Sequence, residues 1–231
     1  MEKPDQTLDV EGIFASSSKD IAAYCVSLDI DNELRIVRLA PNSRHSVGKR
    51  WADTRRREFF AGRWAAASAI KNLLGIPAVP ARNDDRSPRW PEGIIGSISH
   101  DHHQAIAVVG NSSKVCRIGV DLESILSHSQ SEVVKETTLT HQDEQYLGYM
   151  SDQRRMITVI FSAKETLFKA LYPEAGEYFD FKDAELVGVC ASSVTLQLCK
   201  KVGSCFESGE RFTVNYLIIS ESVLTWQIDF H

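Results

Sequence analysis

The stretch Gln153–Leu171, QRRMITVIFSAKETLFKAL, gives the clearest indication of the fold. Its apolar residues recur at three-to-four-residue spacing and form one stripe, which comprises Met156, Ile160, Ala163, Leu167 and Leu171. This pattern is typical of an amphipathic helix that packs on a core. Four segments that alternate apolar and polar residues follow the helix, namely AELVGVC, SVTLQLC, FTVNYLII and LTWQIDF. Alternation of this kind predicts antiparallel strands, so one long helix precedes a sheet.

The residues before this helix repeat the same combination of helix and sheet. YCVSLDI and LRIVRLA, residues 24–30 and 34–40, are strand-like, with a turn expected at Asp31-Asn32. Residues 46–74 are periodic like a helix, which Gly75 and Pro77 should end. A hairpin is expected from IIGSISH and QAIAVVG, then a strand from CRIGVDLE and helical structure over 131–149. The sequence therefore predicts an α+β protein with two lobes, residues 1–117 and 118–231, each an antiparallel sheet packed with helices.

Composition restricts the class of protein. The 231 residues carry a net charge of −5, which argues against a general nucleic-acid binder. The N-terminus lacks the pattern of a signal peptide, and no apolar run approaches the ~20 residues that span a bilayer. The five cysteines are odd in number and include no C-x-x-C pair, as in proteins with reduced thiols. These features predict a soluble, cytoplasmic protein.

A pair of carboxylates stands in IGVDLE, residues 118–123. In a strand, Asp121 and Glu123 project from the same face, about 6–7 Å apart along the chain. Two carboxylates so placed can converge on Mg²⁺, which takes oxygen ligands and commonly binds one or two carboxylates together with substrate phosphates. Taken alone, however, the hexapeptide is better explained as an edge strand whose acids face solvent.

A second polar pair, Glu165 and Lys169, lies on the side of the long helix opposite the apolar stripe. Four residues apart, the two side chains would stabilise an exposed helix by only ~0.2–0.5 kcal/mol. Three aromatic residues flank the pair, Phe161, Phe168 and Tyr172, which is more apolar surface than a solvent-facing side usually has. The pair is therefore a candidate for chemistry as well as an ordinary ion pair.

Phosphate-binding side chains occur in the first half of the chain. In GSISHDHHQ, residues 96–104, Ser99 and His100 are suited to donate hydrogen bonds to a phosphate or a ribose. Adjacent Ser-His-Asp residues cannot form a nucleophilic triad, and the histidines lack a fourth zinc ligand at a familiar spacing. Arginines, whose guanidinium groups bind phosphate in bidentate fashion, gather nearby: Arg55, Arg56, Arg57, Arg63 and Arg82. For any single arginine, a solvated basic surface is the simpler interpretation.

In this order, the motifs resemble those of the 4′-phosphopantetheinyl transferases. That family has a G-x-D-x-E strand followed some forty residues later by F/W-S/C-x-K-E-x-x-x-K on a helix. Here the two motifs are GVDLE, residues 119–123, and FSAKETLFK, residues 161–169. The upstream segments WPEGIIGSISH and RRREFFAGRWAA look like the family's substrate-binding segments. The similarity covers roughly residues 55–186 and is greatest to the enterobactin-synthase component D branch, which serves siderophore and other nonribosomal peptide synthases.

The resemblance implies a reaction and a set of residue roles. Coenzyme A would donate its phosphopantetheine arm to a serine hydroxyl of an apo carrier protein, releasing adenosine 3′,5′-bisphosphate. The two lobes would be related by a pseudo-twofold axis, with coenzyme A in the cleft between them and a monomer sufficient for activity. Mg²⁺ would be bound by Asp121, Glu123 and Glu165, with Lys169 on a phosphate and Glu165 as the general base. The 3′-phosphate and adenosine would be held by Arg55, Arg63, Arg82 and His100, assisted by Ser99.

Two other functions use the same residues. A magnesium-dependent nucleotide phosphohydrolase would need the carboxylates but neither the arginines nor a protein-docking surface. A non-catalytic module that binds carrier domains would lack a carboxylate or lysine of the motifs, and none is missing here. The aromatic segment after Lys169, YPEAGEYFDF, is the candidate docking surface for the carrier.

Overall fold

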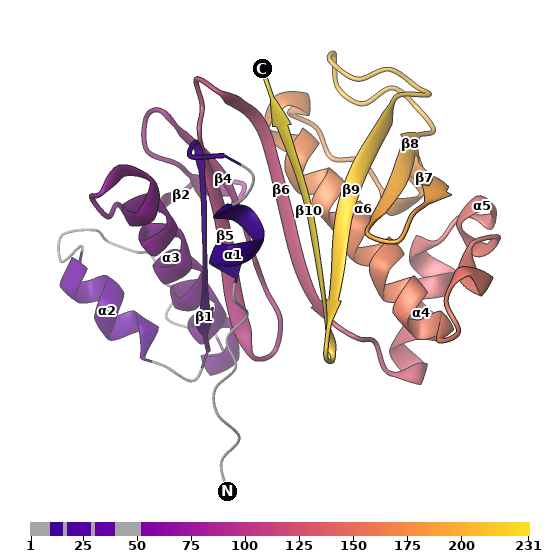
Figure 1. Cartoon of the computed structure of the whole chain (residues 1–231), viewed down its shortest axis with the longest axis horizontal. Helices are drawn as coiled ribbons and strands as arrows, with labels where there is room; N and C mark the ends of the chain where they lie inside the picture. Colours follow the sequence, from indigo (N-terminus) through magenta and orange to yellow (C-terminus); the bar gives the residue numbers. More distant parts are fainter. Residues whose placement is uncertain (1–9, 16–17, 29–30, 40–51) are drawn as a thin grey trace, which may run out of the picture. The chain divides into compact units, whose positions relative to one another are not determined.

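The computed structural model describes residues 10–15, 18–28, 31–39 and 52–231, and Figure 1 shows helices packed beside antiparallel strands. This confirms the α+β class. The chain divides into two compact units, Met1–Ile118 with Asp229–His231 and Gly119–Ile228. By this division Ile118 and the last three residues belong to the first unit, whereas the sequence analysis placed them in the lobe 118–231. The pseudo-twofold relation and the cleft between lobes stay predictions.

The first unit is a three-stranded antiparallel sheet covered by a long helix. In sheet order the strands are β1 (Ile21–Ser27), β5 (Gln104–Asn111) and β4 (Ile94–His100), and β4 and β5 form the expected hairpin. The helix, α3 (Asp53–Leu74), packs on β1 and β5 through small residues such as Ala61, Ala65 and Ala69, all fully buried. It ends where predicted, at Gly75 in a left-handed conformation. Residues 46–51 of the predicted helix lie outside the described residues.

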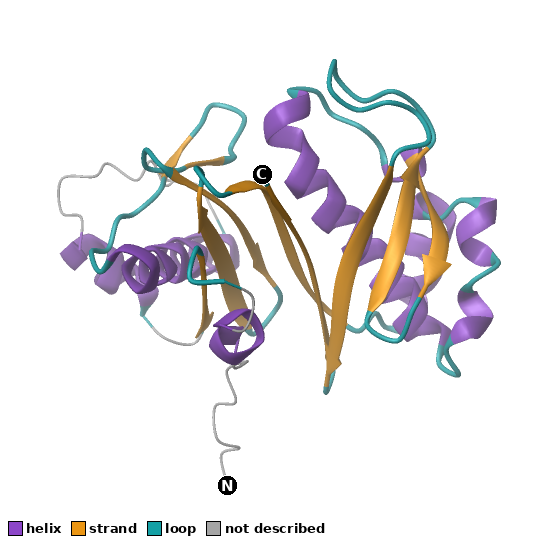
Figure 2. Cartoon of the chain, turned by 45° about the horizontal axis from the view of Figure 1, so that its top comes forward, coloured by secondary structure: helices purple, strands orange, loops and turns teal. Residues whose placement is uncertain are grey.

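Short elements complete this unit. They are α1 (Val10–Ala15), α2 (Asn32–Leu39), β2 (Ala81–Arg82) and β3 (Pro88–Arg89). The two-residue strands β2 and β3 pair with each other within the stretch 77–93, which is rich in Pro, Asp and Arg. In Figure 2 they are short orange strands that a loop joins to each other.

The prediction of a strand over 34–40 is wrong, because Asn32–Leu39 forms the helix α2. Asp31, expected in a turn, accepts a hydrogen bond from the backbone N–H of Leu34, as an N-cap residue does. Ile36 is fully buried, whereas Leu34 and Val37 are exposed, so the apolar residues follow a helical and not an alternating pattern. Contacts with α3 favour this outcome, including an ion pair between Glu33 and Arg56.

The second unit contains the five-stranded sheet and the long helix. The strands occur in the order β6 (Val115–Ser124), β10 (Ser222–Phe230), β9 (Arg211–Ile219), β8 (Ser193–Leu198) and β7 (Ala184–Val189). From β10 to β7, successive strands pair antiparallel. The helix, α6 (Gln153–Ala175), buries all five residues of the predicted stripe completely. The four strands predicted after the helix are therefore confirmed.

Residues 131–149, expected to be helical, form three short pieces. They are α4 (His128–Thr138), α5 (His141–Glu144) and the 3₁₀ turn η1 (Leu147–Tyr149). A capping box of Ser127 with Gln130 starts α4, and a second one, of Thr140 with Asp143, starts α5 and so interrupts the helical stretch. A further 3₁₀ turn, η2 (Phe181–Asp183), precedes β7.

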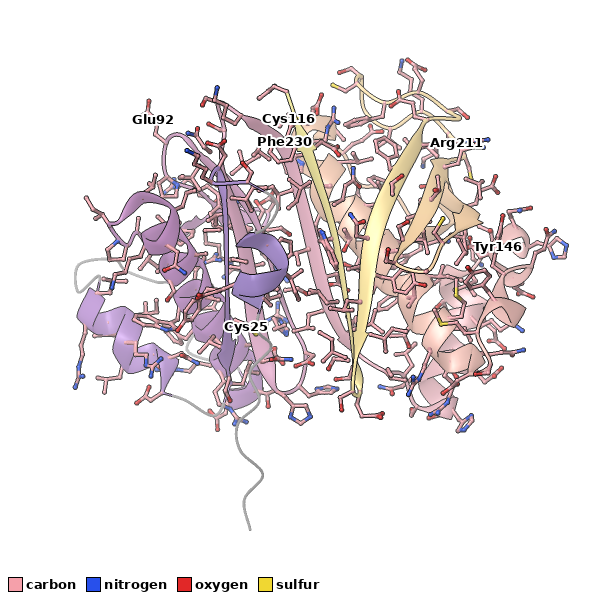
Figure 3. All side chains as sticks on the ribbon, viewed as in Figure 1. Cys25, Glu92, Cys116, Tyr146, Arg211 and Phe230 are labelled. Carbon is pink, nitrogen blue, oxygen red and sulfur yellow. The ribbon has the colours of Figure 1, made fainter. Side chains whose placement is uncertain are left out.

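None of the five cysteines forms a disulfide. Two of them, Cys25 on β1 and Cys116 on β6, are labelled in Figure 3. Among the described residues, no helix is both long enough and apolar enough to cross a membrane.

Candidate functional site

The two motifs of the second unit meet because β6 and α6 pack at unusually short range. A Cβ atom on Gly119 would lie 2.1 Å from the carbonyl oxygen of Thr166 and 3.0 Å from the Cβ of Ala170. Only glycine permits this approach of strand to helix. Since alternate residues of a strand share a face, Asp121 and Glu123 follow Gly119 on the side of β6 that faces α6.

Asp121 is the centre of the resulting polar cluster and is 2% exposed. Its Oδ2 accepts a hydrogen bond of 2.7 Å from Ser162, and its Oδ1 accepts one of 2.6 Å from Lys169. Ser162 and Lys169 are seven residues apart and so lie on one side of α6. Thr166, between them, shares a buried hydrogen bond with Thr225 of β10. A buried carboxylate thus receives a cation and a hydroxyl, which satisfies its need for partners.

Lys169 brings the remaining carboxylates into the cluster. Burial lowers its pKa, but the attraction of Asp121, Glu165 and Glu123 outweighs this and raises it. The pKa of Glu165 is raised, first by burial and then by Asp121, against the opposing effect of Lys169. Lys169 is therefore coupled electrostatically to all three carboxylates, and Glu165 is also coupled to Asp121.

The donor set suits a hard divalent cation, since all three predicted ligands are carboxylates and Glu165 is held where its charge is poorly solvated. In the part of the chain that the structure describes, however, no three His, Cys, Asp or Glu side chains are grouped closely enough to form a metal site. In this structure the cation next to Asp121 is the ammonium group of Lys169.

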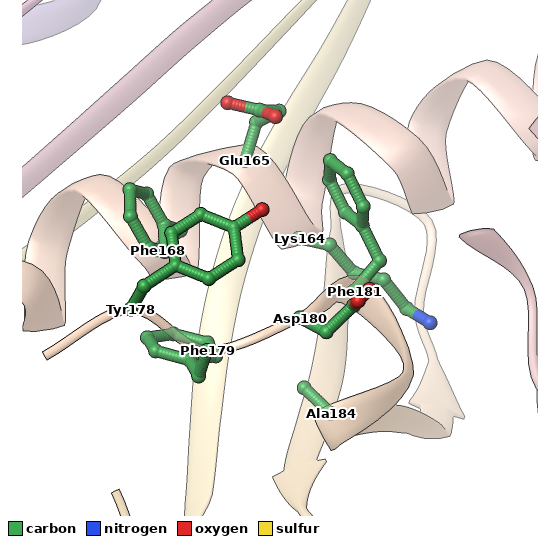
Figure 4. A pocket seen from close by; sticks show the side chains of 8 residues that line it. All are labelled: Lys164, Glu165, Phe168, Tyr178, Phe179, Asp180, Phe181 and Ala184. Carbon is green, nitrogen blue, oxygen red and sulfur yellow. The ribbon is translucent and has the colours of Figure 1, made fainter. Parts of the chain in front are cut away.

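An aromatic pocket of about 70 Å³ adjoins Glu165. Figure 4 shows Phe168 of the same helix, together with Tyr178 and Phe181, around it. Phe168 packs against both Tyr178 and Phe179, with ring centroids 5.2 Å apart in each pair. The segment after Lys169 therefore lines this pocket, and whether it also contacts a carrier stays a prediction.

Lys164, next to Glu165 in sequence, points the other way (Figure 4) into a buried ion pair. Its Nζ lies 2.5 Å from Asp143 and 3.1 Å from the carbonyl oxygen of Thr138. Asp143 also accepts hydrogen bonds from the backbone N–H groups of Thr140 and Leu186. The contacts of Lys164 and Asp143 therefore connect α4, α5, α6 and β7. Burial lowers the pKa of Lys164, and Asp143 partly offsets this.

Sequence reasoning did not find this pair, although a signal exists. Lys164 follows Ile160 by four residues and precedes Leu167 by three, so it lies on the apolar stripe of α6. A lysine at such a position requires a buried acid or carbonyl group.

The first unit has a pocket of about 350 Å³ between α3, β4 and the β2–β3 hairpin. Four of the residues predicted from sequence to hold the 3′-phosphate and adenosine line it: Arg55, Arg63, Arg82 and His100. Ser99 is not among the lining residues. It is buried beside His100 on β4, and neighbouring residues of a strand point to opposite faces. Arg56 does not line this pocket either, because it pairs with Glu33 at 2.5–2.7 Å.

Arg63 is the most unusual side chain of this pocket. It is only 5% exposed, and its pKa is lowered to about 10, first by burial and then by the nearby charge of Arg82. Its Nη2 donates to the carbonyl oxygen of Ala81, and its guanidinium lies 4.9 Å from the ring centroid of Phe59. Its buried Nε has no hydrogen-bond partner in the structure. A buried cation with an unused donor is the expected state of an anion site whose ligand is a phosphate.

Two further charged residues of the pocket were not predicted, Glu58 and Arg86. Glu58 precedes Gly62 by one helical turn, on the side of α3 that faces β4. Arg86 lies in the β2–β3 turn, with a positive φ of 76°.

Family models match most of the chain. The 4′-phosphopantetheinyl transferase N-terminal domain matches residues 44–110, and the 4′-phosphopantetheinyl transferase superfamily model matches residues 117–221. The two matched ranges contain both charged sites described above.

Several curated proteins are similar in sequence. Enterobactin synthase component D of Salmonella typhi is 34% identical over 145 residues, and the match covers 62% of this chain and 59% of that protein. The same component of Escherichia coli O157:H7 is 31% identical over 174 residues, covering 74% and 76%. 4′-Phosphopantetheinyl transferase PptT of Mycobacterium tuberculosis is 31% identical over 150 residues, covering 64% and 62%. The chain thus spans less than two thirds of the length of some of these relatives.

Proposed function

The chain belongs to the 4′-phosphopantetheinyl transferase superfamily, and from this premise we propose that it transfers the phosphopantetheine arm of coenzyme A to a serine of apo carrier proteins. The carriers would be peptidyl, aryl or acyl carrier domains of nonribosomal peptide or siderophore synthesis. Support for this pathway comes from the similarity to relatives named enterobactin synthase component D.

The observation that carries the proposal is the unpartnered, buried Nε of Arg63 inside a pocket that also contains Arg55, Arg82 and His100. The positive charges of these side chains repel one another unless an anion binds between them. Coenzyme A has a 3′-phosphate, and guanidinium groups bind phosphate with paired hydrogen bonds. A phosphohydrolase that acts on nucleotides without a 3′-phosphate would have no use for this pocket.

The reaction requires an activated hydroxyl and a stabilised leaving group. The serine Oγ would attack the phosphorus that carries the pantetheine arm, and the bond from this phosphorus to the bridging oxygen would break. Adenosine 3′,5′-bisphosphate leaves, and the serine proton must pass to a base. Glu165 would take this proton, because it is the carboxylate that α6 carries one helical turn before Lys169 in the cluster. Lys169 would bind a phosphate oxygen of the pyrophosphate.

We further propose that Asp121, Glu123 and Glu165 hold Mg²⁺ during the reaction. When bound, the cation would neutralise charge on the pyrophosphate oxygens. Binding requires that Lys169 share Asp121 with the metal or turn from it toward phosphate, since Lys169 and Asp121 are 2.6 Å apart. We also propose that a monomer acts in the cytoplasm, where its five thiols remain reduced.

The decisive experiment incubates the protein with coenzyme A, Mg²⁺ and an apo carrier, and follows the intact mass of the carrier. We expect a gain of ~340 Da, which is the mass of the arm. Carriers from fatty-acid and peptide synthesis, run side by side, define the substrate class. Glu165→Ala should abolish the gain, whereas Arg211→Lys, an exposed change on β9, should leave it intact. Release of phosphate without a change in carrier mass would favour a phosphohydrolase, and binding without either would favour a non-catalytic module.

A further inference from the structure

Glu58 is the one carboxylate among the described side chains that line the arginine pocket. It stands there with four arginines and a histidine: Arg55, Arg63, Arg82, Arg86 and His100. A carboxylate in a phosphate site repels the ligand, so its presence requires a compensating role. The proposed function assigns none to it.

The packing of α3 on β4 determines what Glu58 faces. A Cβ atom on Gly62 would lie 2.9 Å from Cγ2 of Ile98, so helix and strand approach closely at this point. Glu58 lies one helical turn before Gly62, and His100 lies two residues after Ile98 on the same face of β4. The two side chains are therefore opposite each other, with 3.9 Å between Nε2 of His100 and Oε2 of Glu58.

Both groups are partly exposed, 43% for the His100 side chain and 21% for Glu58, so a ligand can reach them. The groups that face His100 act in two directions. The arginines of α3, β2 and the β2–β3 turn disfavour a protonated imidazole, whereas Glu58 favours it. Asp101, the next residue, is buried and accepts hydrogen bonds from the backbone N–H groups of His103 and Gln104. Glu58 is thus the carboxylate of this pocket that is placed to offset the effect of the arginine charges on His100.

We propose that Glu58 is a positioning residue that keeps His100 protonated, so that His100 meets the 3′-phosphate as a cation and not as a neutral ring. The identity of the phosphate rests on the proposed function, but the pairing of Glu58 with His100 does not. At neutral pH an isolated histidine is mostly neutral. With Glu58 beside it, His100 adds a positive charge and a charge-assisted hydrogen bond to the site.

The pairing is tested without any substrate by NMR titration of the histidine ring signals. The His100 signal is assigned by its loss in His100→Gln. In Glu58→Gln we expect the pKa of His100 to fall by about 0.5–1 unit. The matched control is Glu92→Gln, which removes an exposed carboxylate at the opposite end of β4 and should leave the titration unchanged (Glu92 is labelled in Figure 3). An unchanged His100 titration in Glu58→Gln would overturn the proposal.

The consequence for the ligand is tested by the KM for coenzyme A between pH 6 and 8.5, with 3′-dephospho-coenzyme A as the comparison. A fall of 0.5–1 pKa unit weakens binding of the phosphate by about threefold to tenfold above pH 7. The difference in KM between Glu58→Gln and the unmodified protein should shrink toward pH 6. With 3′-dephospho-coenzyme A, the two proteins should have the same KM. A KM that falls at every pH would show that Glu58 only repels the ligand, which contradicts the proposal. Lack of any transfer, with His100 shifted as expected, would refute the proposed function and leave the pairing intact.

Discussion

Lys164 and Lys169 are five residues apart on one helix, yet their surroundings are opposite. Lys169 is 25% exposed and shares three carboxylates, which raise its pKa. Lys164 is 1% exposed and pairs with the single carboxylate of Asp143, and burial lowers its pKa. A lysine near several acids and partly open to solvent can exchange partners. A fully buried lysine holds a fixed geometry, which here connects α6 to three other elements.

The first residue-scale prediction concerns this buried pair. Lys164→Met removes one charge and leaves the carboxylate of Asp143 buried with its two backbone donors only. Breaking a buried pair in this way costs about 3–5 kcal/mol. The free energy of unfolding, measured by urea titration, should fall by this amount. As a control, Lys201→Met breaks the exposed pair with Glu207 and should change stability by less than about 1 kcal/mol. Equal effects of the two substitutions would contradict the structural role of Lys164.

The second residue-scale prediction concerns Glu165 and pH. Its pKa in the folded state is raised above that of the unfolded chain, chiefly by burial. The folded protein therefore binds the proton more tightly, so the protonated carboxyl stabilises it at low pH and this contribution is lost as the pH rises through the folded pKa. Glu165→Gln keeps the neutral form at every pH. Its stability relative to the unmodified protein should rise with pH and then level off, as thermal unfolding from pH 4 to 8 would reveal. A constant difference would show that the charge of Glu165 is fully compensated.

At the scale of elements, the contact between β6 and α6 is the critical one. Gly119→Ala would place a methyl group 2.1 Å from a backbone oxygen of α6, which cannot move as a flexible side chain does. Overpacking of this kind costs typically about 1–3 kcal/mol, and the helix must shift away from the strand. We therefore expect lower stability and an even larger loss of transfer activity, since Asp121 and Lys169 would separate. Gly188→Ala on β7, where the nearest atom is 3.5 Å away, is the matched control. Full activity in Gly119→Ala would exclude this contact as the determinant of the site.

The same scale explains what the sequence could predict. Strong periodicity predicted α6, the hairpin and the last four strands, because the buried faces of these elements are set by long regular patterns. Residues 34–40 were mispredicted as a strand, because isoleucine and valine, here Ile36 and Val37, are common in strands. The packing on α3 that favours the helix α2 is not local in the sequence. The pockets show the same limit. Arg55 and Arg63 lie on one helix and were assigned through the family resemblance, whereas Glu58 opposite His100 and Lys164 opposite Asp143 depend on which elements pack together.

At the scale of the whole molecule, the charged groups of the two units should respond to different ligands. The arginine pocket belongs to the first unit and the carboxylate cluster to the second. Adenosine 3′,5′-bisphosphate carries the 3′-phosphate but lacks the pantetheine arm, so it should bind the arginine pocket without Mg²⁺. At a concentration of 100 times its Kd, a ligand that binds only the folded state raises the free energy of unfolding by about 2.7 kcal/mol. For a chain of this size each kcal/mol raises Tm by roughly 2–4 °C.

Arg63→Met separates the stability of the free protein from its ligand binding. Removing a buried cation whose Nε has no partner relieves a cost of about 1–3 kcal/mol, partly offset by loss of the contacts with Ala81 and Phe59. We therefore expect the Tm of the free protein to stay equal or rise, while the increase caused by adenosine 3′,5′-bisphosphate disappears. Arg211→Lys should retain that increase in full. If Arg63→Met instead unfolded the protein and no ligand raised Tm in the parent, the guanidinium would serve the fold alone. The opposite result, a more stable protein that no longer binds the nucleotide, would mean that the protein retains a destabilising buried charge for the sake of its phosphate ligand.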